Sequence, residues 1–238
     1  AASVPTIPIP PLGSTATAAL TLAAAALDTN PRPAARQAAE KPTRTPSLGV
    51  LAIFKNEAQI LVEWVRHYRL EGVSQFVLID DTSTDGGERV ARGLGADVSV
   101  VASLGRGTQV ESYRAWVNMM HTDWMLVADL DEFVYARPQP GNLQPTIPQY
   151  LGTVDETIGA VVMPWVLFAS TRDEHPASVI AASRQRGPAA FQGINHKTIV
   201  RRAHLCTADS FGVHGALTST RHALATRPPN TDTSSWAP

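Results

Sequence analysis

Apolar and polar residues alternate along the middle of the chain with two different periods. Four short apolar runs, at 48–54, 75–80, 97–101 and 124–129, have the length and composition of buried strands. Between them, apolar residues recur at the spacing of one face of a helix. We therefore predict strands that alternate with helices, an order typical of an α/β fold with a mainly parallel sheet and helices on both faces.

The sequence also predicts where these helices begin and end. The first should begin with Asn56 as its N-cap and end at Gly72. A short helix should run through Leu94, and 108–121 should form a third helix. The apolar faces of the first and third helices are Ile60, Leu61, Trp64, Val65 and Tyr68, and Val110, Tyr113, Trp116, Val117 and Met120.

Beyond Ala136 the alternation loosens, and only 158–168 and 198–202 are predicted as further strands. Residues 1–46 are rich in Ala, Pro and Thr, and 223–238 have a similar composition. Such segments cannot bury enough apolar surface to offset the entropy lost on ordering. We expect a disordered lead, a single folded domain at 47–222 and a disordered tail.

Composition and charge narrow the function classes. The 238 residues carry a formal net charge of −1, so no basic excess favours nucleic acid as a partner. One cysteine, Cys206, excludes a disulfide framework and disfavours a cysteine-rich zinc site. The alanine-rich stretch at 16–27 is too short to span a bilayer, and no other stretch is expected to cross a membrane.

Polar and acidic clusters follow three of the predicted strands. They are Lys55-Asn56-Glu57, the segment 80–86 that begins with Asp80-Asp81, and Asp129-Leu130-Asp131-Glu132. Because the carboxyl ends of parallel strands meet at one edge of the sheet, we expect the three clusters to converge. Gathered carboxylates repel, so the sequence predicts a Mg²⁺ or Mn²⁺ ion held by carboxylates together with substrate phosphates. The alternative for each cluster is an ordinary turn.

The set of clusters resembles the family 2-like glycosyltransferases, and among them the group that contains family 92. The matching positions are Phe54-Lys55-Asn56-Glu57, Glu63-Trp64, His67-Tyr68, Gly72-Val73, 79–86, Gln109, Tyr113, Trp124, 129–133, Trp165, Phe168, 197–200 and 213–214. The resemblance implies a GT-A fold and a metal-dependent, hexosyltransferase-like enzyme. Such an enzyme would move a sugar from a nucleotide-diphosphate sugar to an acceptor.

By the same resemblance, each cluster has a role in donor binding. Asp81 matches the residue that contacts the nucleotide base, with Asp80 beside it, and Asn56 and Glu57 belong to the same donor-binding edge. Asp129 would reach the ribose or a metal-bound water, and Asp131 would ligate Mn²⁺ or Mg²⁺.

Two later residues complete the implied donor site. His214 matches a late metal-ligand histidine, and its alternative is a surface or core histidine. Lys197 would neutralise a phosphate, and its alternative is a solvated lysine on a strand edge.

Members of the family generally invert the anomeric centre, which requires a general base. The usual Glu-Asp pair of family 2 is not found after Asp131. Among the later acidic residues we favour Asp173 and Glu174, which follow the stretch where the acceptor side is expected. Glu132 is the runner-up, and its alternative role is to brace the Asp-Leu-Asp loop. The Gln-X-X-Arg-Trp signature of processive synthases is absent, so a non-processive enzyme is expected.

The resemblance also favours a UDP-sugar donor and a glycan or lipid-linked acceptor, as in polysaccharide biosynthesis. It suggests a cytoplasmic protein and allows peripheral association with the inner face of the membrane. A degenerate, non-catalytic domain that binds a sugar nucleotide is the alternative. Receiver-type phosphoacceptors fit less well, because their acidic pair and single Asp follow other strands. Haloacid-dehalogenase-type phosphatases fit less well, because their Asp-X-Asp box usually lies near the chain start with Thr or Val two residues later, whereas here the box is mid-chain and Phe133 stands at that position.

Overall fold

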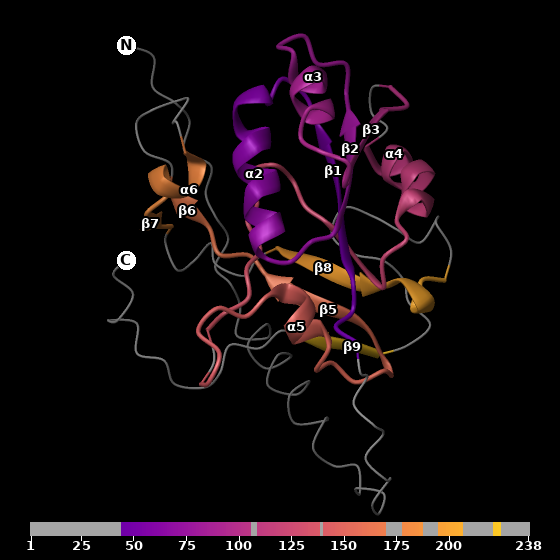
Figure 1. Cartoon of the computed structure of the whole chain (residues 1–238), viewed down its shortest axis with the longest axis vertical. Coiled ribbons are helices and arrows are strands. Elements are labelled where there is room, and N and C mark those ends of the chain that lie inside the picture. Colours follow the sequence, from indigo (N-terminus) through magenta and orange to yellow (C-terminus); the bar gives the residue numbers. More distant parts are fainter. Residues whose placement is uncertain are drawn as a thin grey trace, which may run out of the picture. The chain divides into compact units, whose positions relative to one another are not determined.

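A computed structural model describes residues 44–105, 109–138, 140–169, 178–187, 195–206 and 221–224, all within the compact unit that begins at Arg44. These residues build a seven-stranded sheet in the order β3-β2-β1-β4-β8-β5-β9 (Figure 1). Its strands are β1 (Leu48–Phe54), β2 (Gln75–Asp80), β3 (Val98–Ala102), β4 (Trp124–Val127), β5 (Ile158–Pro164), β8 (His196–Arg201) and β9 (Arg221–Leu224). A second, two-stranded sheet pairs β6 (Phe168–Ala169) with β7 (Gln185–Arg186).

The sheet is mainly parallel. Strands β3, β2, β1 and β4 run in the same direction, and β9 runs parallel to β5. Only β8 is antiparallel to both of its neighbours, β4 and β5. The helices are α2 (Ala58–Leu70), α3 (Gly87–Arg92), α4 (Gln109–Trp116), α5 (Ile147–Leu151) and α6 (Val179–Ala182), with short 3₁₀ turns η1 (Val117–Met119) and η3 (Arg202–His204). The predicted α/β fold is confirmed.

Alternate residues of β1 enter two different cores, as the period of a strand requires. Val50 and Phe54 pack with Trp64 of α2, whereas Leu51 packs on the opposite face with Tyr113 of α4. The two helices accordingly lie on opposite sides of β1 and β2 (Figure 1). Both faces of the central strands are therefore buried, which explains why these strands read as continuous apolar runs in the sequence.

The C-terminal end of α2 confirms its predicted terminator. Gly72 has φ +89°, a left-handed conformation that glycine adopts without steric cost. Its amide donates to the carbonyl of Arg69, and the amide of Val73 donates to that of Tyr68 at 2.9 Å. This pair of bonds is the Schellman arrangement, which satisfies carbonyls that the helix itself leaves unpaired.

The N-terminal end of α2 corrects the prediction that Asn56 is the N-cap. The cap position is Glu57, and its side chain does not bond the first turn. Asn56 instead has φ +55°, and the first amide of α2, that of Ala58, donates to Asp85 at 2.8 Å. The capping oxygen thus comes from a loop 27 residues further along the chain, which local sequence rules cannot detect.

Several other boundaries differ from the prediction. Strand β4 ends at Val127 rather than Asp129, and the helix expected at 108–121 changes to the turn η1 after Trp116. Helix α5 was not predicted, although Thr146 and Gln149 form a capping box at its start. Strand β9 extends to Leu224, two residues beyond the expected domain boundary at 222.

The described segment also begins inside the expected lead. Arg44 pairs with Asp123 at 2.8 Å, and the amide of Ser47 donates to the same carboxylate at 2.7 Å. Within the described residues, no helix combines the length and apolar character needed to cross a bilayer.

Candidate active site

The sheet has a point where its strand order reverses. From β1 the chain adds β2 and then β3 on one side, and it later places β4 on the other side of β1. In open α/β sheets, ligands bind at the carboxyl ends of the strands that flank such a point. Here those ends lead directly into Lys55-Asn56-Glu57 and into Asp129-Leu130-Asp131-Glu132.

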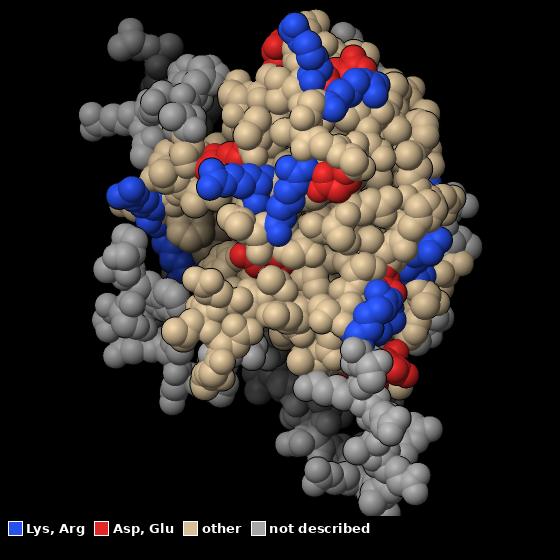
Figure 2. Space-filling model, in the orientation of Figure 1, with Lys and Arg blue, Asp and Glu red and all other residues tan. Residues whose placement is uncertain are grey.

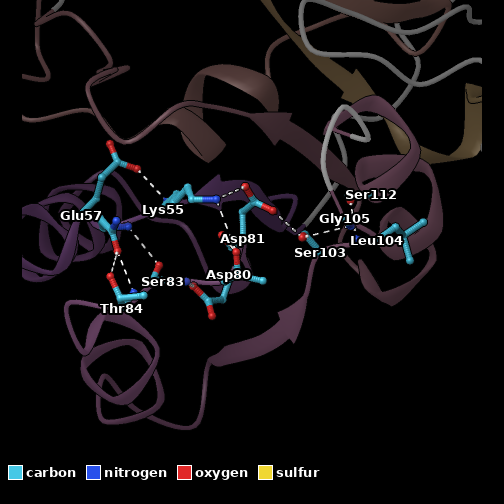
Figure 3. Close-up of polar contacts among 12 residues, drawn as sticks. Lys55, Glu57, Asp80, Asp81, Ser83, Thr84, Ser103, Leu104, Gly105 and Ser112 are labelled. Atoms are coloured by element: carbon cyan, nitrogen blue, oxygen red, sulfur yellow. Dashed lines mark hydrogen bonds and ion pairs between the residues drawn. The ribbon is translucent and has the colours of Figure 1, made fainter.

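The clusters after β1 and β2 meet through an ion pair. The Nζ atom of Lys55 lies 3.2 Å from Oδ2 of Asp81, and the hydroxyl of Ser103 donates to Oδ1 of Asp81 at 2.6 Å. Figure 3 shows Lys55 between Glu57 and Asp81, with Ser103 on the far side of Asp81. Lys55, Glu57 and Asp81 border a cleft of about 420 Å³. Its lining residues are Ile53, Phe54, Lys55, Glu57, Asp81 and Gln109.

Two of the predicted donor-binding residues fix the loops beside this cleft. The side-chain oxygen of Asn56 accepts from the amide of Thr84 at 2.7 Å, and the amide of Asn56 donates to Ser83 at 3.0 Å. The carboxylate of Asp80 accepts from the amide of Ser83 at 3.1 Å (Figure 3). Asn56 therefore connects the two loops, and Asp80 fixes the turn within the loop after β2. Asp81 is the member of the acidic pair that lines the cleft.

Glu57 links the third cluster to the first two. Its burial raises the pKa of its carboxyl group above 4.5, and the negative charges of Asp131 and Asp129 raise this pKa further. The amide of Lys55 donates to Glu57 at 3.3 Å and acts in the opposite direction. Because Lys55 also pairs with Asp81, the three polar clusters converge as the sequence predicts.

The loop after β4 is held by buried aromatic side chains. The indole of Trp64 donates to the carbonyls of Asp129 and Glu132, at 3.0 and 3.1 Å. The hydroxyl of Tyr68 donates to the carbonyl of Glu132 and accepts from the amide of Val134. Both rings are fully buried, so the backbone of this loop has a fixed position relative to α2.

Glu132 makes the contacts of a residue that braces this loop. Its carboxylate accepts from the amide of Asp129 at 2.9 Å and lies 3.0 Å from Nζ of Lys197. Burial raises the pKa of Glu132, while the amide bond and the lysine charge lower it. These contacts match the alternative role stated for Glu132 rather than that of a base facing an acceptor.

Lys197 lies on β8 and is almost completely buried. Its side chain is 3% exposed, and Nζ donates to Oδ2 of Asp129 at 2.9 Å. The alternative of a solvated lysine on a strand edge is therefore wrong, because β8 lies between β4 and β5. Whether Lys197 also meets a phosphate stays a prediction.

Asp131 differs from the other carboxylates of the site. It is exposed, and within the described residues it forms no hydrogen bond or ion pair. An exposed carboxylate of this kind suits a hard divalent cation that completes its shell with phosphate and water oxygens. No three His, Cys, Asp or Glu side chains of the described residues form a cluster that could hold a metal.

Three predicted site residues lie outside the described residues. They are the general-base candidates Asp173 and Glu174 and the metal-ligand candidate His214. The sequence alone assigns no role to three residues of this site. Lys55 and Gln109 line the cleft, and Ser103 donates a hydrogen bond to Asp81. Lys55 and Gln109 stand inside the stretches that carry the family resemblance, whereas nothing in the sequence distinguishes Ser103 from an ordinary loop serine.

The surface adds no second charged site on the face that Figure 2 shows. Among the described residues on this face, acidic and basic side chains lie beside one another in small groups. In the described part of the chain, Arg69 pairs with Asp97 at 2.6 Å and Arg92 pairs with Glu88 at 2.8 Å. This mixed distribution agrees with the net charge of −1.

Comparison with known proteins gives matches of structure only. No protein-family model and no curated protein matches the chain. The chain is similar to a mannosyltransferase from Pyrobaculum calidifontis solved with GDP-Man and Mn²⁺, with 19% identity, a TM-score of 0.45, and coverage of 63% of this chain and 43% of that one.

Two further solved structures are similar at a lower level. A mannosyl-3-phosphoglycerate synthase from Rubrobacter xylanophilus has 15% identity, a TM-score of 0.36 and coverage of 49% and 39%. A glucosyl-3-phosphoglycerate synthase from Mycobacterium tuberculosis has 19% identity, a TM-score of 0.33 and coverage of 49% and 43%. The chain thus matches less than half the length of each of the three structures. Likeness at this level concerns the fold and does not identify a function.

Proposed function

We propose that this protein is a GT-A-type glycosyltransferase that transfers a hexose from a nucleotide-diphosphate sugar. One observation carries the proposal: polar loops from three parallel strands converge beside a cleft at the point where the strand order reverses. Within it, Lys55 pairs with Asp81 at 3.2 Å, and Asp131 acts on the pKa of Glu57. Ordinary turns would not require this convergence of charge.

The donor would lie across the cleft with its base towards Asp81. A carboxylate accepts hydrogen bonds, so Asp81 suits a base edge that presents N–H donors. The bond from Ser103 fixes the orientation of Asp81 for this contact. We favour UDP as the nucleotide.

Asp131, with Asp129 and His214, would hold Mn²⁺ or Mg²⁺ against the diphosphate. When bound, such an ion supplies charge that stabilises the leaving nucleotide.

The transfer itself would be a direct displacement with inversion. An acceptor hydroxyl oxygen forms a bond to the anomeric carbon while the bond from that carbon to the phosphate oxygen breaks. The hydroxyl proton passes to a carboxylate, for which Asp173 and Glu174 are our candidates. The acceptor would be a glycan or lipid-linked sugar in non-processive polysaccharide assembly, in the cytoplasm or at the inner face of the membrane.

A panel of nucleotides and nucleotide sugars tests this function. We expect UDP or GDP, and their sugars, to raise the melting temperature, and Mn²⁺ to enlarge that rise. A nucleotide at one hundred times its dissociation constant stabilises the folded state by about 2.7 kcal/mol. Slow, Mn²⁺-dependent release of nucleoside diphosphate from the donor without acceptor would then identify an enzyme rather than a binding domain. A panel without any shift contradicts the proposal.

A further inference from the structure

Lys197 occupies an unusual position for a lysine in the donor site. Among the described residues it is the only charged side chain that is fully buried. Its Nζ lies 2.9 Å from Oδ2 of Asp129 and 3.0 Å from Oε2 of Glu132. A buried ammonium group is costly unless its charge and its donors are satisfied, and here two carboxylates of one loop satisfy them.

The other lysine of the site has opposite properties. The side chain of Lys55 is 47% exposed, and it lines the cleft. It pairs with the carboxylate of Asp81, which is itself partly exposed. An incoming phosphate could reach Lys55 without displacing a buried ion pair, whereas at Lys197 it would compete with two carboxylates that already contact the ammonium group.

We propose that Lys197 is a positioning residue that holds Asp129 in its working orientation, rather than a residue that binds the donor phosphates. The inference rests on the proposed function, because Asp129 is expected to reach the donor. Lys197 and Glu132 together fix Asp129, since Glu132 accepts from the amide of Asp129 and pairs with the same lysine. Asp131 then remains as the carboxylate of this loop that faces the ligand.

The backbone contacts agree with this division of roles. Trp64 holds the carbonyl oxygens of Asp129 and Glu132, so both ends of the short turn are fixed. The side chain of Asp129 is the remaining degree of freedom, and its Oδ2 atom is the one that Lys197 binds. A carboxylate fixed on one oxygen can still accept a ribose hydroxyl or a metal-bound water on the other.

A double-mutant cycle separates positioning from direct phosphate contact. The variants are Lys197→Met, Asp129→Asn and the charge-balanced double variant. The ligand is whichever of UDP or GDP the wild-type protein binds more tightly, measured by calorimetry in saturating Mn²⁺. We expect each single variant to weaken binding about tenfold, which is about 1.4 kcal/mol. The double variant should bind as Asp129→Asn does, because Lys197 acts through Asp129.

Independent effects that multiply to about a hundredfold loss in the double variant would overturn the proposal. Unchanged affinity in Asp129→Asn would overturn it as well. If Lys197→Met alone fails to fold, the affinities of Asp129→Asn and of the double variant still test the proposal. These two variants differ from each other only at residue 197. Arg92→Met is the matched control: it removes an exposed ion pair on α3, with side chains 57% and 52% exposed, and should leave affinity unchanged.

The same variants distinguish this inference from the proposed function. A wild-type protein that binds neither UDP nor GDP contradicts the function. The melting temperatures still test the ion network in that case, because Lys197→Met leaves two carboxylates without their counter-ion and the double variant leaves one. Equal melting temperatures for Lys197→Met and the wild type would show that the ion pairs of Lys197 with Asp129 and Glu132 do not stabilise the loop after β4.

Discussion

At the scale of single residues, the carboxylates of the site differ in their partners and therefore in what they can do. Asp80 and Asp85 accept backbone amides, and Asp129 and Glu132 share Lys197. Asp131 alone of the third cluster is left exposed without a partner among the described residues. Acidic residues that look equivalent in the sequence thus have different roles: most of them stabilise the loops, and Asp131 is the candidate for ligand binding.

Asp131→Asn tests the metal assignment. The substitution removes one negative charge and one strong oxygen ligand from an exposed position, so the fold should persist. We expect the Mn²⁺-dependent part of the nucleotide-induced rise in melting temperature to disappear. Glu88→Gln on α3, where the carboxylate is 52% exposed, is the matched control and should keep the full Mn²⁺ effect. Retention of that effect in Asp131→Asn would show that Asp131 is not a ligand.

Asp81→Ala tests the nucleotide assignment. The variant removes the acceptor that borders the cleft, so the affinity for nucleoside diphosphate should fall at least tenfold, with cooperative unfolding unchanged in shape. Ser103→Ala removes the 2.6 Å bond that orients Asp81, together with the longer bond that the Ser103 oxygen accepts from the amide of Gly105 at 3.3 Å. Its effect should be smaller, about 0.5–1.5 kcal/mol in binding free energy. An unfolded Asp81→Ala variant would instead identify a structural turn.

At the scale of secondary-structure elements, one side chain caps two helices. The carboxylate of Asp85 accepts from the amide of Ala58 at the start of α2 and from that of Gly87 at the start of α3, both at 2.8 Å. The loop after β2 is thereby joined to the helix after β1.

Asp85→Ala should cost about 1 kcal/mol of unfolding free energy, in the range for lost helix caps. The amide bond from Ala58 lowers the pKa of Asp85 below its ordinary value of 3.8. The unfolded chain therefore binds a proton at higher pH than the folded one. The stabilisation is complete above about pH 4 and is lost as pH falls through the lowered pKa of the folded state.

Urea unfolding at several pH values measures this dependence. The difference in free energy between the wild type and Asp85→Ala should be constant from pH 7 to about pH 5 and should shrink below about pH 4. Asp85→Asn keeps one capping oxygen and should lose less. A difference that persists undiminished at pH 3 would exclude the capping carboxylate as its source.

Tyr68→Phe tests how α2 holds the loop after β4. The hydroxyl on the fully buried ring of Tyr68 bridges the carbonyl of Glu132 and the amide of Val134, and removing the hydroxyl leaves a partly buried amide without this partner. We expect a loss of about 1–3 kcal/mol of unfolding free energy and weaker nucleotide binding. Tyr135→Phe is the control, because Tyr135 is 53% exposed and its variant should match the wild type. If Tyr68→Phe were as stable as Tyr135→Phe, the hydrogen bonds of the Tyr68 hydroxyl would not stabilise the loop.

At the scale of the whole molecule, the strand β8 joins the two halves of the sheet. It lies between β4 and β5 although about 70 residues separate it from β4 in the chain, and it contributes Lys197 to the site. Neighbouring residues of β8 enter different cores: Ile199 packs with Trp124, and Val200 packs with Met125. Both cores should therefore unfold together.

Ile199→Ala and Met125→Ala test this cooperativity, one in each core. Each creates a cavity in a fully packed region and should cost about 2–5 kcal/mol. Near-ultraviolet and far-ultraviolet circular dichroism should report one common transition for both variants. Leu143→Ala, at a residue 79% exposed, should change stability by less than about 0.5 kcal/mol. Two separate transitions would contradict a single cooperative unit.

Local sequence patterns were sufficient for the first part of the fold. The prediction gave β1 and β2 their observed bounds and placed the end of α2 at Gly72. Each of these features depends on neighbouring residues: an apolar period, or a glycine that can adopt a positive φ. The pairing of β8, the short α5 and the boundaries after Val127 were missed or shifted, because long-range pairing and tertiary packing decide them.

By itself, the sequence determined the α/β class, the succession of the first four strands along the chain and the polar clusters that follow three of them. Periodicity and chain order carry this information, since parallel strands bring their carboxyl ends to one edge. Only the tertiary structure decided which acidic side chains are paired. Lys197 reaches Asp129 from 68 residues away, and Asp85 caps a helix that begins 27 residues earlier. Such contacts join distant segments, and no local pattern of residues encodes them.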